Sequence, residues 1–522
     1  MLITLRLDQS RLWRWHLTLI QQLEAAHNAR VIATFSPATY PLAPALRRAI
    51  RLEAAIARTA AHNPFDPLTL ADFDPWLSGL TTEPDIVIDL STSLLPPPQS
   101  ARVLVPLFND QPGETVFWQA LLDGKAPHLS LFDTTQKIIV IGQPAIESPH
   151  ALRTSAAGVV TRLMTGLVHA ANASQQTSEA VTVQHPRSLP PSLSLTRASA
   201  SLLARKVTTK AQRIIHGMLG TAPHWAVAYR TLPADHDPLA SGNLDPAAFT
   251  LLPDDGKRYY ADPFLFAHLT DQHNPELYLF VEELFYATNK GIISVTTRRP
   301  DGTFSTPRPV LETPFHLSYP HVFTRDGEIW MLPEQSASGG LTLYRATRFP
   351  DVWEPAAQLI DEPLHDATLF EQDDRLWIAA NVQGPATARW GSSWDSLSLF
   401  SAPTLLGPWT AHPGNPVLID AATSRAAGVP IEVSGRHYRP VQDCSTGYGV
   451  ALSLAEITTL TPTTFAQTVV GKIAFPASSG IVGPHTLNRC PHGATMMEVI
   501  DLFAAPNTIR RAFGIKDPAT PR

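Results

Sequence analysis

From about residue 222 onward, the chain consists of short apolar strands separated by tight turns, and this pattern repeats. Similar units begin at Asp262, "YPHVF", "HDATLF", "SRAAGVPI" and "GPHTLN", with a spacing of about 45 to 60 residues. Inside the units, "RDGEIW", "QDDRLW" and "VSGRHY" each join two strands in the way that hairpin turns do. A period of this length is typical of propeller blades. The five starts therefore predict an all-β, five-bladed β-propeller.

The stretch "HWAVAYRTL" precedes the first unit and has the pattern of a further strand. We expect it to complete the last blade and close the ring, because closure removes exposed strand edges. A β-sandwich also contains many short strands. It does not, however, place polar residues at one phase of a long repeat.

Residues 1–173 have a different pattern, in which strand-like and helix-like segments alternate. The strand-like segments are "LITLRL", "ARVIATFS", "PDIVIDLS", "ARVLVPLF" and "KIIVIGQP", and the clearest helices are "SRLWRWHLTLIQQLEAAHN" and "SAAGVVTRLMTGLVHAANA". This alternation predicts an α/β domain with a parallel sheet. Residues 174–221 read as a linker followed by a helix, and residues 222–522 as the propeller.

Composition narrows the classes of partner. The net charge is −6 and no dense basic run occurs, so we expect no nucleic-acid partner. No apolar run approaches the roughly 18 residues of a membrane span. The first residues, "MLITLRLDQSRLWRW", lack the apolar core of a secretory signal, so we expect a cytoplasmic protein. Without a GxGxxG or HExxH motif, we expect neither a cofactor nor a metal, and the oligomeric state stays open.

Polar residues recur at the start of each unit, where the innermost strand of a blade enters the axial channel. They are Asp262, Tyr319, His321, His365, Asp366, Arg425 and His485. In "KRYYADPFLF", a carboxylate at this position is explained if Asp262 faces a polar axial cavity. Structural roles stay open, because Asp262 can cap a turn, His365 can pair with Asp366, and Arg425 can bridge blades.

Sugar-processing chemistry needs two carboxyl groups whose environments hold their pKa values apart. Asp262 and Asp366 are the natural pair, since they come from nonadjacent blades. Glu283 and Glu334 end second strands, and Asp443 has a similar place in the fourth unit. We assign catalysis to Asp262, Asp366 and Glu334.

The remaining polar residues at this end of the units are assigned to substrate binding, because they can hold hydroxyl groups or orient a carboxylate. The assigned residues are Tyr319, His321, His365, Arg425, Asp443, His485 and Trp390. Trp390 shares the loop "ARWGSSWDS" with Trp394, and either ring is a candidate platform for stacking a sugar.

Several of these motifs occur together in one known family. "YYADPFLF", "YLFVEE", "HDATLFE", "SRAAG", "YRPVQDCSTGYG" and "GPHTLN" resemble the N-terminal propeller of plant glucosamine inositolphosphorylceramide transferases and their bacterial relatives. That domain is similar to the five-bladed propellers of glycoside hydrolase family 43. The resemblance implies an aspartate base at Asp262 and a second aspartate, tuning the acid, at Asp366. The family's glutamate acid has no matched motif here.

The first domain resembles the formyltransferase fold in "PDIVIDLSTSLLPP" and "FWQALLDGKAPHLSLFDTT". The Asn-x-His motif of those enzymes is absent, and "DLSTSLLPP" stands in its place. The resemblance thus implies a domain that has lost formyl transfer.

Taken together, the sequence favours a carbohydrate-active protein, either a glycosidase or a related sugar-transfer enzyme, with its site in the propeller funnel. A phosphorylase variant is compatible with Arg425 and the histidines. Two alternatives stay open. One is a noncatalytic protein that binds a glycan or nucleotide sugar during polysaccharide or glycolipid assembly, and the other is a propeller scaffold for partner proteins.

Overall fold

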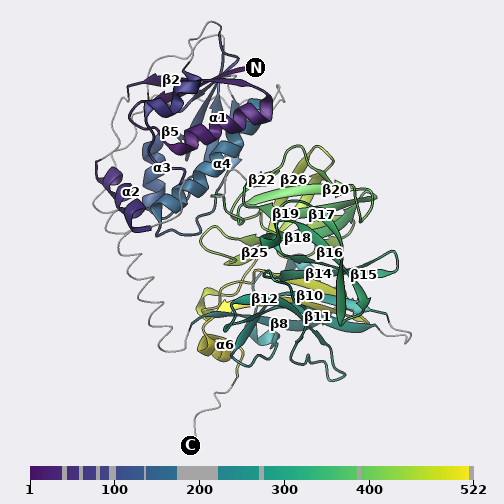
Figure 1. Cartoon of the computed structure of the whole chain (residues 1–522). Helices are drawn as coiled ribbons and strands as arrows, with labels where there is room; N and C mark the ends of the chain where they lie inside the picture. The colour runs from purple at the N-terminus through teal and green to yellow at the C-terminus, as the bar shows by residue number, and fades with distance from the viewer. Residues whose placement is uncertain are drawn as a thin grey trace, which may run out of the picture. The chain divides into compact units, whose positions relative to one another are not determined.

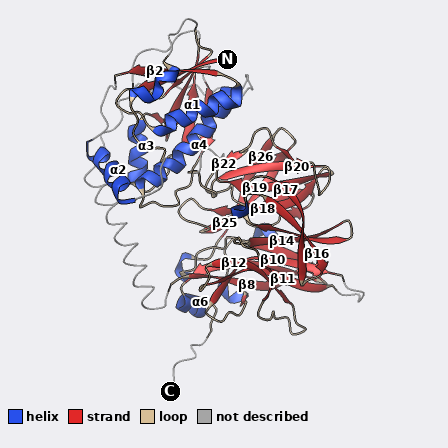
Figure 2. Ribbon diagram, in the orientation of Figure 1, coloured by secondary structure: helices blue, strands red, loops and turns tan. Residues whose placement is uncertain are grey.

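The computed structural model describes residues 1–37, 44–57, 63–77, 83–92, 101–134, 137–172, 222–240, 242–269, 275–384 and 390–515. The chain forms two compact units. Unit 1 is Met1–Ala211 with Gln383–Ser392, and unit 2 is Gln212–Val382 with Ser393–Arg522. Long helices belong to unit 1, whereas unit 2 is built almost wholly of strands (Figure 2). The linker and helix predicted for residues 174–221 lie outside the described residues.

Unit 1 contains a mixed sheet and four described α-helices. Its strands are β1 (Leu2–Asp8), β2 (Arg30–Ser36), β3 (Ile86–Asp89), β4 (Arg102–Phe108), β5 (Gln111–Pro112), β6 (Leu129–Asp133) and β7 (Lys137–Gly142). Its helices are α1 (Arg14–His27), α2 (Pro44–Ala57), α3 (Glu114–Leu122) and α4 (Leu152–Asn172). Helix α4 has apolar residues on most of its surface and packs against α1, α2 and α3.

The sheet of unit 1 has the order β2-β1-β3-β4-β6-β7, with β5 beside β4. Strands β1 to β4 run parallel, as predicted. The prediction is wrong for β6, which pairs antiparallel with β4 on one side and with β7 on the other, so that β7 runs in the same direction as β4. The short connection between β6 and β7 accounts for the antiparallel pairing of these two strands, because a parallel neighbour would need a crossover of a dozen residues or so. The resemblance to formyltransferases stays a prediction.

Unit 2 consists of five sheets in chain order, which confirms the five-bladed propeller (Figure 1). Blade 1 contains β10 (Arg258–His268), β11 (Glu276–Phe285), β12 (Lys290–Thr297) and β13 (Arg308–Leu311). Blade 2 contains β14 (Ser318–Arg325), β15 (Glu328–Glu334), β16 (Leu341–Arg348) and β17 (Val352–Ile360). Blade 3 contains β18 (Leu364–Gln372), β19 (Arg375–Val382), β20 (Ser396–Ala402), β21 (Thr410–Ala411) and β22 (Leu418–Ile419).

Blade 4 contains β23 (Ile431–Val433), β24 (Arg436–Asp443), β25 (Ala451–Leu460) and β26 (Phe465–Ile473). Blade 5 joins the two ends of the unit, because β27 (Leu487–His492) and β28 (Thr495–Ala504) are followed across the sheet by β8 (His224–Pro233) and β9 (Thr250–Leu251). The short helix α6 (Pro506–Ala512) follows β28. The pairing of β28 with β8 confirms that "HWAVAYRTL" closes the ring. None of the helices in the described part of the chain is long and apolar enough to cross a membrane.

The innermost strands of blades 1 to 3 share one irregularity. Their registers shift between Ala261 and Phe264, between Ser318 and His321, and between His365 and Thr368. Within these shifts Asp262, Tyr319 and Asp366 have φ angles of 48°, 47° and 48°. Aspartate tolerates this left-handed region better than most residues, whereas a bulky tyrosine does so only under constraint. Such bulges take a backbone N–H out of the strand ladder and re-aim the side chain.

A buried charge cluster reinforces the closing blade. Arg489, Glu498 and Arg230 occupy one rung across β27, β28 and β8. Glu498 is fully buried and accepts hydrogen bonds from Nε of Arg489 at 2.6 Å and from Nε of Arg230 at 2.7 Å. The carboxylate therefore links the C-terminal hairpin to the strand that begins unit 2.

We predict that Glu498→Gln lowers the free energy of unfolding by about 3 kcal/mol, because removing one member of a buried ion cluster leaves the others uncompensated. Chemical denaturation followed by tryptophan fluorescence measures the change. The matched control is Glu456→Gln, which removes a pair with an exposed arginine, Arg436. It should cost less than about 1 kcal/mol. Equal effects of the two changes would contradict the role given to Glu498.

Candidate functional site

Hydrogen bonds between blades position the candidate acids. The N–H of Asp262 donates to Oδ2 of Asp501 at 3.1 Å, and the N–H of Asp366 donates to Oε2 of Glu334 at 3.2 Å. At the start of blade 4, the N–H of Ala426 donates to Oδ1 of Asn381 at 3.3 Å. In all three, a side chain on the second strand of one blade accepts from the innermost segment of the next. We call this arrangement the interblade clasp.

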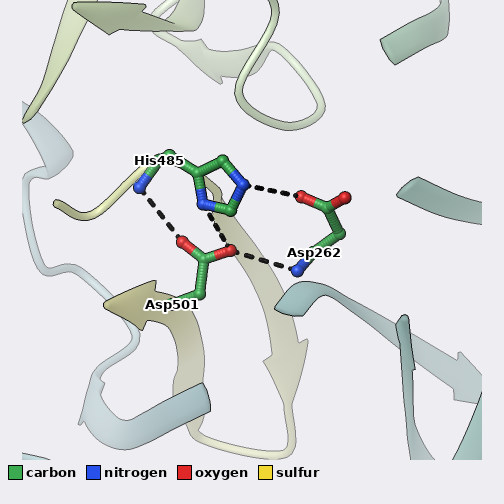
Figure 3. A group of neighbouring side chains, drawn as sticks. All are labelled: Asp262, His485 and Asp501. Atoms are coloured by element: carbon green, nitrogen blue, oxygen red, sulfur yellow. Dashed lines mark hydrogen bonds and ion pairs between the residues drawn. The ribbon is translucent and has the colours of Figure 1, made fainter. Parts of the chain in front are cut away.

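Asp262 belongs to the first cluster, in which His485 lies between Asp262 and Asp501 (Figure 3). Nε2 of His485 is 3.3 Å from Oδ1 of Asp262, and its Nδ1 is 2.7 Å from Oδ2 of Asp501. Oδ1 of Asp262 also accepts from the Thr486 hydroxyl at 2.9 Å, and Oδ2 accepts from the N–H of Tyr319 at 3.3 Å. The imidazole is therefore held by a carboxyl group on each side.

The protonation of this cluster follows from burial and charge. Burial raises the pKa of Asp262 to about 8, against the opposing effect of His485. Burial works to lower the pKa of His485, but the carboxylates of Asp501 and Asp262 outweigh it and raise that pKa to about 9. Both pKa values lie above neutral pH, so the buried cluster binds protons more tightly than the isolated groups would. A carboxylic acid that keeps its proton near pH 7 is suited to proton donation rather than to the role of base that the family resemblance implied.

A second cluster forms around Asp366. Its Oδ2 accepts from Nε of Arg425 at 2.7 Å and from Nε2 of Gln442 at 3.0 Å. Burial and the Glu334 carboxylate raise the pKa of Asp366 to about 7, although Arg425 opposes them. Nδ1 of His365 lies 3.0 Å from Oε1 of Glu334. Burial works against ionisation of Glu334, but its hydrogen bond with His365 and the charge of Arg425 bring its pKa well below the usual range.

Half-buried aromatic side chains connect the two clusters. The ring of Trp225 stacks on His485 with centroids 3.9 Å apart. Tyr448 meets His485 edge-on at 5.4 Å, and Cζ of Arg425 lies 5.1 Å from its centroid. Trp394 is 5.3 Å from Tyr448. This set of rings can stack a sugar, and Trp394, unlike Trp390, belongs to it.

The first cluster can be tested for a metal. Asp262, His485 and Asp501 offer one ligand atom each within 4.8 Å of one another. Metal binding requires a neutral imidazole with a free lone pair. Here both ring nitrogens face carboxylate oxygens, and the pKa of His485 is raised to about 9. The residues present fit a protonated imidazole better than a metal.

Other assigned residues lie away from the two clusters or are closed in. Tyr319 is fully buried, and its hydroxyl accepts from the N–H of Gly428 at 2.7 Å and lies 2.8 Å from the Thr368 hydroxyl. His321 is buried against Phe264, and burial lowers its pKa to about 4. Both assignments assumed that every residue at this phase faces solvent, but these rings fill the space between blades instead.

Asp443 and Trp390 also differ from the assignment to substrate binding. Asp443 accepts from the Ser445 hydroxyl and from Nζ of Lys472 at 2.9 Å, so its carboxylate is engaged within blade 4. Trp390 falls in the segment that clusters with unit 1. The contacts of Asp443 within blade 4 do not support a role at the hub.

Sequence reasoning missed one carboxylate, Asp501. In "EVID" it stands on the second strand of its blade, as Glu334 does in "MLPE", and that shared position is the signal that would have found it. Glu283, which the sequence offered as a candidate, pairs with Arg258 and the Ser294 hydroxyl. Its neighbour Glu282 faces the other side of β11, as alternation along a strand requires.

The raised pKa of His485 predicts a pH dependence of stability. The folded protein holds the imidazole proton up to about pH 9, whereas the unfolded chain releases it near pH 6.5, the ordinary pKa of histidine. The stabilisation is complete below pH 6.5 and disappears as pH rises through 9. It amounts to about 3 kcal/mol. The raised pKa values of Asp262 and Asp366 act in the same direction.

Denaturation curves from pH 6 to 10 measure this effect. The free energy of unfolding should fall with rising pH, and His485→Asn should flatten that fall while lowering stability at pH 6. A stability that rises between pH 7 and 9 in the unaltered protein would contradict the protonated imidazole.

Most of the propeller matches a known protein family. Residues 252–479 match the family model described as glucosamine inositolphosphorylceramide transferase 1, N-terminal. The protein of that name from Oryza sativa subsp. japonica is 34% identical over 216 residues, which are 41% of this chain and 28% of that protein. The protein of that name from Arabidopsis thaliana is 29% identical over 215 residues, 41% of this chain and 27% of that protein. The chain thus spans little more than a quarter of the length of these relatives.

Among solved structures, a family 117 glycoside hydrolase from Zobellia galactanivorans, Zg3597, gives a TM-score of 0.33 at 10% identity, covering 57% of this chain and 93% of that one. RS223-Beta-xylosidase gives 0.34 at 12% identity, covering 47% and 92%. The family match confirms for the propeller the resemblance that the motifs indicated: from residue 252 to residue 479, the chain is similar to the N-terminal domain of glucosamine inositolphosphorylceramide transferase 1.

Proposed function

We propose that unit 2 is a carbohydrate-active enzyme that breaks or transfers a glycosidic bond at the hub between Asp262 and Asp366. One observation carries the proposal. Two buried carboxyl groups, from blades 1 and 3, have pKa values raised to about 8 and about 7, beside the fixed positive charges of His485 and Arg425. Strongly perturbed groups that converge from separate elements are characteristic of catalytic sites.

The chemistry assigns Asp262 as the proton donor. As the glycosidic bond breaks, the leaving oxygen takes the proton of the Asp262 carboxyl group, and the resulting carboxylate remains paired with the His485 imidazolium. Asp501 holds the other ring nitrogen, so the imidazolium keeps its orientation. General acid catalysis of this kind contributes about 10² to 10⁴ in rate.

Asp366 and Glu334 have positioning roles in this proposal. Arg425 and Gln442 fix Oδ2 of Asp366, whose charge raises the pKa of Asp262. Glu334 accepts from the N–H of Asp366 and from the Ser336 hydroxyl, and it contacts His365. With its oxygens engaged in these contacts and its pKa well below the usual range, Glu334 acts as a clasp for Asp366 and not as an acid.

The substrate class that we propose is a glycoside or a sugar conjugate such as a glycolipid. The half-buried rings of Trp225, Trp394 and Tyr448 provide apolar faces next to the two acids. The relatives that match the propeller carry the name of a glucosamine inositolphosphorylceramide transferase, which is consistent with sugar transfer.

A noncatalytic sugar-binding protein is the second candidate. It is favoured by the fact that both oxygens of Asp262 already have partners, Thr486 and His485 on Oδ1 and the N–H of Tyr319 on Oδ2. A carboxyl group held on both oxygens is rigid. Rigid polar groups beside aromatic rings suit specific binding as well as catalysis.

Turnover of a panel of aryl glycosides and oligosaccharides tests the proposal. We expect Asp262→Asn to lower kcat by at least about 100-fold, as loss of a general acid does. Asp366→Asn should lower kcat by a smaller factor. It should also shift the basic limb of the pH profile to lower pH, because it removes a charge that raises the pKa of Asp262. Glu456→Gln, on the rim of blade 4, is the control and should leave kcat unchanged.

Two results would decide against catalysis. Turnover that survives in both aspartate variants would place the reaction elsewhere. Sugar-dependent thermal stabilisation without turnover in the unaltered protein, retained in both variants, would favour the binding protein.

A further inference from the structure

Glu282 lies at a position on the second strand that recurs from blade to blade. In blades 2 and 3 the residues at this position join neighbouring blades. In blade 1, Glu282 pairs with Ala261, the residue before the bulge. In blades 2 and 3, Glu334 pairs with Ser318 and Asn381 with His365, which are the equivalent residues. Glu334 and Asn381 each form an interblade clasp, because they accept the N–H at the start of the next blade.

The junction between blades 1 and 2 is joined differently. The N–H of Tyr319, which a clasp from Glu282 would satisfy, donates instead to Oδ2 of Asp262 at 3.3 Å. At this junction Asp262, and not a residue of the second strand, accepts the N–H at the start of the next blade. Glu282 is therefore a buried carboxylate, 6% exposed, that is not needed to join the blades.

The carboxylate of Glu282 contacts the segment just before blade 2. Its Oε1 lies 3.2 Å from Nε2 of His316, and it shares a hydrogen bond with the Tyr259 hydroxyl. The side chain of His316 is 42% exposed, whereas that of Glu282 is 8% exposed. The carboxylate thus sits one side chain below the solvent boundary, in contact with a ring that reaches it.

The geometry of His316 fixes its proton. Nδ1 accepts a hydrogen bond from the N–H of Gly291 at 3.0 Å, so the ring proton lies on Nε2 and points at Glu282. Glycine is required at 291, because a Cβ there would come within 2.7 Å of the imidazole and 2.5 Å of the carbonyl oxygen of Leu317. The absence of a side chain at Gly291 therefore leaves room for the His316 ring beside the Glu282 carboxylate.

The charge of Glu282 also affects the pKa of Asp262. They lie on adjacent strands of blade 1, on either side of one bulge. Burial is the main cause of the raised pKa of Asp262, and among the neighbouring carboxylates Glu282 contributes the largest further increase. The two carboxyl groups of blade 1 therefore interact electrostatically.

We infer that Glu282 is a further catalytic residue, the carboxylate that accepts a proton from the attacking water or hydroxyl group, with His316 as its positioning residue. The inference rests on the proposed function. In the step, the attacking oxygen forms a bond to the anomeric carbon and its proton passes to Glu282. The bond from that carbon to the leaving oxygen breaks, and the leaving oxygen takes the proton of Asp262. One water or acceptor hydroxyl is consumed, and solvent returns the proton from Glu282 to Asp262.

Adjacent glutamates on opposite faces of β11 provide a matched pair of variants. Glu282→Gln should lower kcat by at least about 100-fold, whereas Glu283→Gln, which alters the buried contact with Arg258, should lower the thermal midpoint and keep kcat within a few-fold. Circular dichroism confirms that each variant is folded. Should Glu283→Gln fail to fold, Glu456→Gln serves as the control.

A series of aryl leaving groups distinguishes the two roles. Loss of a proton acceptor should slow phenyl, nitrophenyl and dinitrophenyl glycosides alike in Glu282→Gln. Loss of a proton donor should slow phenyl glycosides most and dinitrophenyl glycosides least in Asp262→Asn. His316→Gln should lower kcat by a smaller factor than Glu282→Gln. A Glu282→Gln enzyme within a few-fold of the unaltered protein, or one whose loss follows the leaving group, overturns the inference.

Binding of cationic imino sugars, measured by calorimetry, separates this inference from the proposed function. If the unaltered protein binds an imino sugar at least about tenfold tighter than Glu282→Gln does, and Glu283→Gln binds normally, Glu282 contacts the sugar even without turnover. In that case hydrolysis fails as the function while the placement of Glu282 stands. If turnover occurs but both glutamate variants behave alike, Glu282 alone is excluded. If the unaltered protein neither turns over glycosides nor binds imino sugars, both proposals fall.

Discussion

A buried backbone N–H must find an acceptor, and the arrangement of this propeller depends on where those acceptors come from. Bulges at Asp262 and Asp366 withdraw N–H groups from their own sheets, and Asp501 and Glu334 of the preceding blades accept them. The same bonds join neighbouring blades and bring acidic side chains to the hub. The residues that join the blades are thus the same residues that place acidic groups at the hub.

The acidic hub requires positive charge in return. Protonated His485 lies between Asp262 and Asp501, and Arg425 contacts Asp366, so each cluster contains one cation. Because the groups are buried, ionising every carboxyl would be costly, and the pKa values of the two bulge aspartates rise toward neutrality. A site of this kind exchanges protons near pH 7, which is the property that glycosyl chemistry needs.

The fold was largely predictable because propeller blades are local in sequence. Each hairpin forms between neighbouring segments, so turns such as "RDGEIW" and the spacing of the units sufficed for the five blades, and "HWAVAYRTL" closed the ring as expected. In unit 1 the alternation of segments indicated an α/β sheet, but the reversed direction of β6 depends on strand pairing that the periodicity does not encode.

For the site, the sequence by itself determined which polar residues stand at the start of the innermost strands, including Asp262, Asp366, Arg425 and His485. Only the tertiary structure decided that the rings of Tyr319 and His321 fill the space between blades, and that Glu282 contacts His316 while Glu283 pairs with Arg258. The physical reason is that a bulge inserts one extra residue into these innermost strands, so side-chain direction there no longer follows simple alternation. Partners such as Asp501 lie more than two hundred residues from the groups that they hold, and sequence proximity carries no trace of that contact.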